Sequence, residues 1–131
     1  MTRREIRELI FKMVFRVEFH DEEEIPQQLR LFMDTLESAS DEERTYIEHK
    51  VQEIPAHLDE IDAIIDSSAQ NWKTSRMAKV ELTLIRLAVY EIRFDDDIPT
   101  GVAINEAVEL AKAYGEENSA SFVNGVLARI A

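Results

Sequence analysis

The chain has 131 residues, a formal net charge of −12 and 45% apolar residues, enough for a continuous hydrophobic core. It contains no cysteine, which excludes disulfide bonds, thiolate metal sites and cysteine nucleophiles. With three glycines and three prolines, it has little turn chemistry for a many-stranded sheet. No apolar run approaches the roughly 20 residues of a membrane span. The first residues are charged where a signal peptide is apolar, so we expect a cytoplasmic protein.

The first predicted helix begins at the start of the chain and is basic. Thr2 and Glu5 have the spacing of a capping box, which places the helix start here. The apolar stripe of this helix comprises Ile6, Leu9, Ile10, Met13, Val14 and Val17. Residues 1–16 carry five basic and two acidic groups, a balance of +3, whereas residues 17–131 carry ten basic and 25 acidic groups, a balance of −15. A local cationic surface attracts polyanions, and the acidic remainder repels nonspecific ones.

Further helices follow as far as residue 68. Pro26 fits the first turn of the second helix. Ser40 and Glu43 form another capping box, and Pro55 is expected to kink or split the helix that starts there. The polar stretch 67–75 then predicts a linker between two helical parts of the chain. The expected helical subdomains are residues 1–68 and 72–131, within a single domain of residues 1–131.

The C-terminal half also reads as helix throughout. Residues 77–94 are apolar on more than one side, which predicts the most buried helix. Thr100 can cap a helix from about residue 102 to Tyr114, and Gly115 is expected to end it in the left-handed conformation. Ser119 can cap the last helix. Since no segment predicts a strand, the expected fold is all-α with about seven helices.

The polar residues do not indicate catalysis or a metal site. His20, His49 and His57 lack the spacing that places two metal ligands on one helical face, so a solvated surface role is expected. The carboxylates of residues 95–97 lack EF-hand spacing and predict a charged turn. The sequence also has no glycine-rich phosphate loop and no nucleophile elbow. We therefore expect a protein that is not an enzyme and has no cofactor.

The arginines of the first helix have two interpretations. Arg3, Arg4 and Arg7 lie within about one and a half helical turns, so that their guanidinium groups can reach successive phosphates. Alternatively, the helix is a solvated amphipathic surface in which Glu5 and Glu8 pair with the arginines. Spacing alone leaves both interpretations open.

Several polar or small residues in the C-terminal half favour a packing role. Glycine inside a helix costs about 1 kcal/mol relative to alanine, so Asn124-Gly125 indicates a close helix crossing or the close approach of a partner. Asn105 can link neighbouring helix ends if it is buried. Arg86 and Glu91, on an otherwise apolar helix, are expected to form buried or half-buried pairs.

Several motifs occur in an order and at a spacing shared with one protein family. They are Arg3-Arg4-x-x-Arg7-Glu8, Leu84-Ile-Arg-Leu-Ala-Val-Tyr-Glu91, Ile98-Pro99, Val102-Ala-Ile-Asn-Glu-Ala-Val-Glu-Leu-Ala-Lys112, Tyr114-Gly115 and Ser119-x-x-Phe-Val-Asn-Gly-Val-Leu127. Together they resemble the NusB family of bacterial transcription antitermination factors. The resemblance is strongest from residue 76 to 127 and weak from 17 to 75.

The resemblance implies a fold and a function. The family is all-α, with two packed three-helix subdomains, and its members are not enzymes. They bind boxA sequences of single-stranded RNA together with NusE, a small-subunit ribosomal protein, and suppress termination by the RNA polymerase elongation complex in ribosomal RNA operons. The implied RNA-binding residues are Arg3, Arg4, Arg7, Tyr114, Asn118 and Phe122. The implied NusE-binding residues are Glu81, Met77 and Leu84.

Some departures and alternatives remain. Ser121 stands where the family frequently has lysine, and Ala128 where an aspartate is common, so we expect weak RNA binding that NusE strengthens. Phe122 can equally belong to the core, and the roles of Lys12 and Arg16 are undecided. Two other functions stay open. One is an accessory RNA-binding module acting in trans with an enzyme that modifies ribosomal RNA, and the other is a homodimer that occludes the RNA surface.

Overall fold

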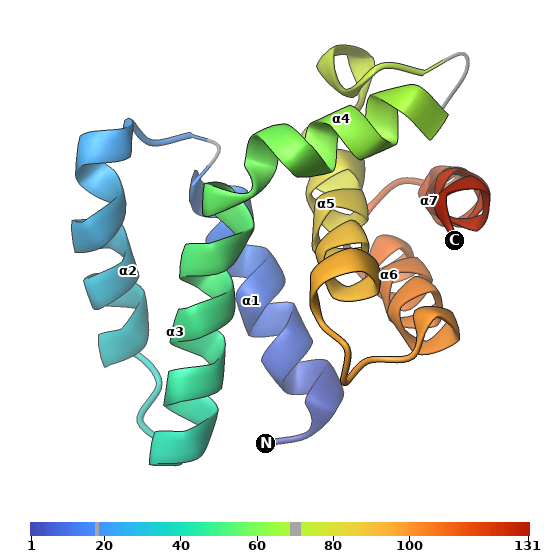
Figure 1. Cartoon of the computed structure of the whole chain (residues 1–131). Coiled ribbons are helices and arrows are strands. Elements are labelled where there is room, and N and C mark those ends of the chain that lie inside the picture. Colours follow the sequence, from blue (N-terminus) through green and yellow to red (C-terminus); the bar gives the residue numbers. More distant parts are fainter. Residues whose placement is uncertain (18, 69–71) are drawn as a thin grey trace. The chain divides into compact units, whose positions relative to one another are not determined.

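The computed structural model describes residues 1–17, 19–68 and 72–131, in which all regular elements are helices (Figure 1). The first compact unit, Met1–Ala56, contains α1 (Arg3–Val17), the short helix η1 (Glu22–Glu24), α2 (Ile25–Asp34) and α3 (Asp41–Ala56). The second unit, His57–Ala131, contains α4 (Leu58–Ser68), η2 (Thr74–Arg76), α5 (Lys79–Phe94), α6 (Thr100–Tyr114) and α7 (Ser119–Ile130). Over the described residues, the prediction of an all-α fold with about seven α-helices is confirmed.

The two units divide between Ala56 and His57, ahead of the linker expected at residues 67–75. The reason is that α4 packs on α5, α7 and η2 and so belongs with the C-terminal helices. Pro55 lies in the last turn of α3, and α4 begins at Leu58, so the predicted split after the proline is observed. Residues 69–71 of the expected linker lie outside the described residues.

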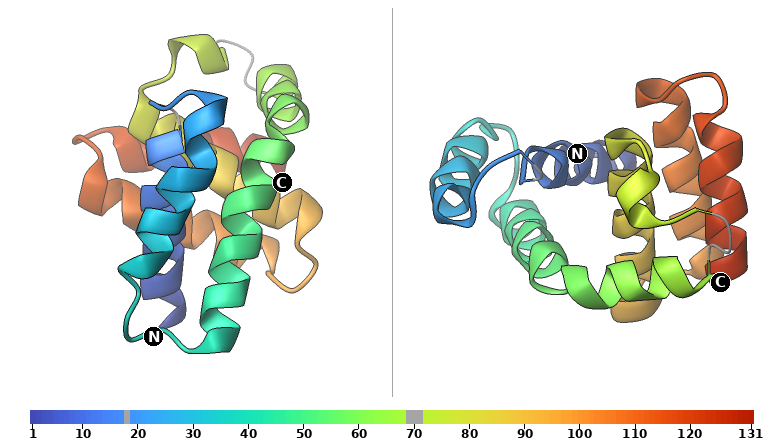
Figure 2. Two further views of the ribbon diagram at one scale, coloured as in Figure 1. Left: turned by 90° about the vertical axis from the view of Figure 1, so that its left-hand side faces the viewer. Right: turned by 90° about the horizontal axis from the view of Figure 1, so that it is seen from above.

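In the first unit, α1, α2 and α3 pack against one another as a three-helix bundle (Figures 1 and 2). Side chains from α1 and α3 that are at most 1% exposed are Ile10, Met13, Ile47, Val51 and Ile54. Burial of each such side chain stabilises the fold by about 1.5–3 kcal/mol. Arg44 of α3 donates hydrogen bonds to the carbonyl oxygens of Met33 and Leu36, near the end of α2. These carbonyls at a helix end have no partner within their own helix, so Arg44 joins α3 to the end of α2.

In the second unit, α5 is the central helix and contacts α4, α6 and α7. Every residue from 82 to 91 of α5 is buried, which confirms the prediction of a helix that is apolar on several sides. The helices α6 and α7 also pack on each other, and together with α5 they form the bulk of this core. The helix α6 begins at Thr100 itself, and Pro99 rather than Thr100 is its cap residue.

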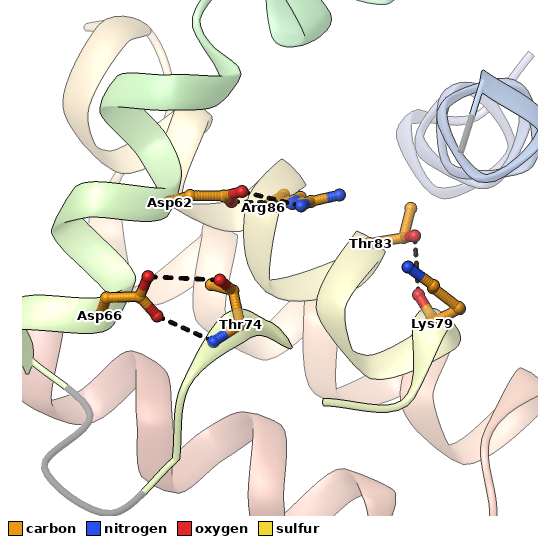
Figure 3. A network of polar contacts seen from close by, with 6 residues as sticks. All are labelled: Asp62, Asp66, Thr74, Lys79, Thr83 and Arg86. Atoms are coloured by element: carbon orange, nitrogen blue, oxygen red, sulfur yellow. Dashed lines mark hydrogen bonds and ion pairs between the residues drawn. The ribbon is translucent and has the colours of Figure 1, made fainter. Parts of the chain in front are cut away.

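Arg86 forms the buried pair expected of it, but two predicted packing roles elsewhere are wrong. Arg86 is 7% exposed, and its Nε and Nη2 atoms each donate a 2.8 Å hydrogen bond to the carboxylate of Asp62 (Figure 3). Glu91 is 1% exposed. In contrast, Asn105 is exposed and so does not link buried helix ends. An added Cβ at Gly125 would meet nothing within 4 Å, so no helix crosses closely there.

Candidate nucleic-acid interface

Two capping boxes and an ion pair hold the starts of α1 and α3. The Thr2 N–H donates to Glu5 Oε1 (3.2 Å), and the Glu5 N–H donates to Thr2 Oγ1 (3.1 Å). At the start of α3, the Ser40 N–H donates to Glu43 Oε1 (2.9 Å), and the Glu43 N–H donates to Ser40 Oγ (3.1 Å). Both predicted capping boxes are therefore confirmed. The terminal ammonium nitrogen of Met1 lies 3.0 Å from Glu43 Oε2, so one carboxylate joins the starts of both helices.

These contacts shift the pKa values of the groups involved. The hydrogen bond from the Thr2 backbone N–H lowers the pKa of Glu5 below its ordinary value of 4.5. The Ser40 backbone N–H has the same effect on the pKa of Glu43. In turn, the hydrogen bond with Glu43 raises the pKa of the Met1 ammonium above 8.0. Near pH 7 all three groups are charged, which favours the geometry that places the following arginines.

The three arginines predicted to bind RNA differ in exposure. Arg3 and Arg4, in the first turn of α1, are exposed, but only 8% of Arg7 is. A phosphate contact through Arg7 would have to use that small exposed part of its side chain. Further along the same helix, Lys12 forms an ion pair with Glu8 (3.2 Å). The surface that α1 offers to a polyanion is therefore centred on Arg3 and Arg4.

The turn between α6 and α7 positions the second group of predicted residues. Gly115 follows Tyr114 with φ −95° and ψ −167°, so the predicted left-handed conformation is wrong. Glycine is needed here because of a close approach instead. An added Cβ would lie 2.5 Å from the Cβ of Ser119 and 2.8 Å from the carbonyl oxygen of Ala111. The absence of a side chain lets the chain turn directly from one helix into the next.

The side chain of Ser119 contacts this turn and does not cap α7. It is the first residue of the helix and is 2% exposed, and the cap residue is Asn118, whose side chain forms no cap hydrogen bond. The Ser119 hydroxyl accepts a hydrogen bond from the Glu116 N–H (2.9 Å) and donates one to Glu81 Oε1 (3.3 Å). The predicted cap is therefore wrong, because this hydroxyl links the turn to α5.

The residues predicted to bind RNA in the second unit lie on and after this turn. Tyr114 is 37% exposed, Asn118 is exposed, and Phe122 is half-buried. The ring of Phe122 meets Trp72 edge to face, with centroids 5.5 Å apart and planes at 82°. Trp72, 53% exposed, was not among the predicted site residues. The available signal was a single large aromatic residue within a polar stretch.

The residues expected to bind NusE are mostly internal. Leu84 is 0% exposed and Met77 is 7% exposed, so both side chains belong to the core. Glu81 is half-exposed and accepts the hydrogen bond from Ser119. Among the three, Glu81 is the side chain that a partner can reach.

The histidines and carboxylates do not form another site within residues 1–17, 19–68 and 72–131. In this part of the chain, no group of three or more His, Asp or Glu side chains is placed to hold a metal ion. His57 is half-buried rather than solvated, because its ring stacks on Phe94 at 4.7 Å. No helix in these ranges has the length and apolar character needed to cross a bilayer.

Comparisons with known proteins agree over nearly the whole chain. A family model described as the NusB family matches residues 4–131. Transcription antitermination protein NusB from Agathobacter rectalis is 60% identical over 131 residues, which cover 100% of both chains. The protein of that name from Lachnoclostridium phytofermentans is 52% identical and is matched over 99% of this chain and 98% of its own length.

Solved structures give the same result. The T. maritima NusB structure matches with a TM-score of 0.89 and 38% identity, covering 99% of this chain and 90% of that one. A chain from a structure described as a "plectonemic RNA supercoil" matches with a TM-score of 0.84 and 26% identity, covering 98% and 92%. By sequence and by fold, this chain belongs to the NusB family.

Proposed function

We propose that this protein is a transcription antitermination factor that binds boxA-type single-stranded RNA together with NusE and suppresses termination by the RNA polymerase elongation complex. Membership of the NusB family supports this, since the relatives are named transcription antitermination proteins. A structural neighbour described as an RNA supercoil supports contact with RNA. The protein is not an enzyme, and it acts through binding.

The observation that carries the proposal is the exposed pair Arg3 and Arg4 at the start of α1. Guanidinium groups bind phosphate oxygens through paired, charge-assisted hydrogen bonds. The N-terminus of a helix adds a partial positive charge. Because the whole chain has a net charge of −12, such a local cationic surface selects where a polyanion can approach.

The other predicted residues have complementary roles in this proposal. Tyr114, Asn118 and Phe122 offer a ring, an amide and a second ring to unpaired bases, as is common in the recognition of single-stranded RNA. Glu81 attracts the basic partner NusE, while Leu84 in α5 and Met77 just before it belong to the core. With few cations available, RNA binding by the protein alone is weak, and NusE strengthens it.

The test of RNA binding compares two double variants at several salt concentrations. Arg3→Ala/Arg4→Ala removes the two exposed arginines, while Lys12→Ala/Arg30→Ala removes two other exposed cations from the same unit. Binding of a labelled boxA oligoribonucleotide is followed by anisotropy, with and without NusE. We expect Arg3→Ala/Arg4→Ala to reduce the slope of log affinity against log salt by about 1.4, because each phosphate contact to a single strand contributes about 0.7.

The control variant is expected to keep the wild-type slope. Equal slopes for wild type and Arg3→Ala/Arg4→Ala would contradict the assignment of these arginines. Equal affinity with and without NusE at moderate salt would contradict the proposed cooperation between the two proteins.

The partner surface is tested separately by charge reversal. Glu81→Arg is expected to weaken capture of NusE while leaving binding of the RNA alone within about threefold. Asp96→Arg places the same charge change in an exposed turn of the same unit and is expected to behave as wild type. Unchanged capture of NusE by Glu81→Arg would refute this surface. Sedimentation of the protein alone tests whether it instead self-associates.

A further inference from the structure

An aromatic pair in the second unit combines an exposed ring with a half-buried one. Trp72 is 53% exposed, and its ring meets Phe122 edge to face at 5.5 Å. In this arrangement the edge of one ring lies against one face of the other, so the remaining ring faces are not covered by the pair. A tryptophan that keeps half of its surface in water is available to stack with a third ring.

The backbone beside Trp72 is anchored to α4. The Thr74 N–H donates a 2.8 Å hydrogen bond to Asp66 Oδ1, and the Thr74 hydroxyl is 3.3 Å from Asp66 Oδ2 (Figure 3). Lys73 Nζ donates a further hydrogen bond to the Asp66 carbonyl oxygen (3.3 Å). The two residues after Trp72 are therefore held to the end of α4. Because the backbone next to Trp72 is already held in place, less conformational entropy is lost when a ring stacks on the indole.

The charges around this pair differ from those of the remaining chain. The 131 residues include 27 carboxylates, yet residues 67–80 and 118–131 contain none, and these are the two longest acid-free runs. Trp72 lies in the first run and Phe122 in the second, so the aromatic contact brings the two runs together. The basic residues in these runs are Lys73, Arg76, Lys79 and Arg129. Lys73 directly follows Trp72, so the exposed indole has a cation beside it in the chain.

The carboxylates that border the first run are engaged within the protein. Asp66 accepts hydrogen bonds from the Thr74 N–H and hydroxyl. Glu81 accepts one from the Ser119 hydroxyl at 3.3 Å. Each accepts a hydrogen bond inside the protein, although Glu81 stays half-exposed, and the exposed side chains between them include Lys73 and Arg76.

We infer that Trp72 is an additional RNA-binding residue, which stacks on an unpaired base beside Phe122 while Lys73 and Arg76 contact the adjoining phosphates. This inference rests on the proposed RNA-binding function and extends its surface to a residue outside the predicted set. Single-stranded RNA is the matching ligand because its unpaired bases stack on aromatic rings and its phosphates bind cations. Basic groups next to an exposed indole are the combination that such a strand requires.

The test uses the fact that Trp72 is the single tryptophan of the chain. A boxA oligoribonucleotide is titrated into the protein at low salt, and the tryptophan emission is followed alongside the anisotropy of labelled RNA. We expect the emission to be quenched over the same RNA concentrations that raise the anisotropy. We also expect Trp72→Ala to weaken binding about 10-fold and Trp72→Phe to stay within about threefold of wild type.

A matched variant removes an exposed aromatic ring elsewhere. Phe19, 60% exposed, belongs to the other unit, and Phe19→Ala is expected to bind RNA as wild type does. Circular dichroism and thermal unfolding check that each variant is folded. If wild type binds RNA without any change in emission, or Trp72→Ala binds as tightly as wild type, the inference is overturned while the proposed function stands. If wild type fails to bind RNA both with and without NusE, both are overturned.

Discussion

At the scale of single residues, Glu43 shows how one carboxylate can join the starts of two helices. Its Oε1 atom accepts the capping hydrogen bond from Ser40, and its Oε2 atom holds the Met1 ammonium. The ion pair therefore depends on two groups with different titration ranges. Arg3 and Arg4 follow directly in the first turn of α1, next to this contact.

We expect the stabilising contribution of Glu43 to be lost in acid. Since its pKa in the folded protein lies below 4.5, the unfolded chain binds this proton more tightly. The contribution is complete above about pH 4.5 and decreases as the pH falls through the folded value. Glu43→Gln should therefore destabilise the protein near neutral pH and much less in strong acid. Urea unfolding at both pH values measures the difference.

Glu48→Gln, at an exposed position of the same helix, is the control for the substitution itself and should leave stability at neutral pH close to that of wild type. An equal effect of Glu43→Gln at both pH values would contradict the prediction. Because the pKa of the Met1 ammonium is raised above 8.0, its own contribution is present below that value and is lost as the pH rises through the folded pKa.

The ion pair between Arg86 and Asp62 leads to a second prediction at this scale. The Arg86 side chain is 9% exposed, so removal of its partner leaves a nearly buried guanidinium without this carboxylate. We expect Asp62→Ala to lower the free energy of unfolding by about 3 kcal/mol. Asp96→Ala removes an exposed carboxylate from a turn and should change it by less than about 0.5 kcal/mol. Denaturant titration compares the two variants, and equal effects would show that the buried pair contributes little.

At the scale of elements, α6 and α7 contain glycines with opposite surroundings. Gly115 ends α6 in extended backbone, where a side chain would collide with Ser119 and with the backbone oxygen of Ala111. Gly125 lies inside α7, where a Cβ would meet nothing within 4 Å. The first glycine is required by the turn. The second weakens the helix without a packing reason in the described structure, so the close approach of a partner stays a prediction.

These surroundings predict effects of opposite sign for the same substitution. Gly115→Ala should destabilise the protein by about 1–3 kcal/mol, because backbone atoms must shift to admit the methyl group. Gly125→Ala should stabilise the free protein by about 0.5–1 kcal/mol through better helix propensity and a less flexible unfolded chain. Thermal and urea unfolding of both variants provide the comparison. Destabilisation by Gly125→Ala would mean that the open space at this position is not available.

At the scale of the whole molecule, the charge distribution has opposite effects on folding and on the binding of a polyanion. The net charge of −12 destabilises the folded state through self-repulsion, which salt screens. The local cationic surface of α1 attracts a polyanion, and salt weakens that attraction. Ionic strength is therefore expected to act in opposite directions on stability and on the proposed RNA binding.

We accordingly expect the Tm to rise by a few degrees between about 0.05 and 0.5 M salt, while RNA affinity falls steeply over the same range. Calorimetry in a non-binding salt and anisotropy in the same buffers measure the two quantities. A Tm that falls with salt would show that attractive ion pairs, such as that of Lys12 with Glu8, outweigh the overall repulsion.

Features that depend on neighbouring residues were predicted correctly from the sequence, whereas features that depend on residues far apart in the chain were not. The capping boxes at Thr2 and Ser40 and the burial of α5 were predicted correctly. The capping boxes are contacts between residues three apart, and the burial of α5 follows from its local apolar composition. The predicted cap at Ser119 was wrong, because its hydroxyl accepts a hydrogen bond from the Glu116 N–H and donates one to Glu81, 38 residues away. The boundary between the units was displaced for a similar reason, since α4 packs on distant helices.

The candidate site divides in the same way. Motif order in the sequence was enough to identify the family and to select Arg3, Arg4 and Phe122 as candidates, and their roles in RNA binding stay predictions. The sequence could not predict that Arg7 is nearly buried or that Trp72 lies against Phe122. Exposure and contact of this kind depend on how helices pack.

The sequence by itself determined the helices, most of their starts, the charge asymmetry and membership of the family, because these depend on the identities of neighbouring residues and on their order. The tertiary structure alone decided which arginines reach solvent, which carboxylate pairs with Arg86 and which ring meets Phe122. The physical reason is that such contacts join residues far apart in the chain. They form only when the apolar faces of the helices are buried together.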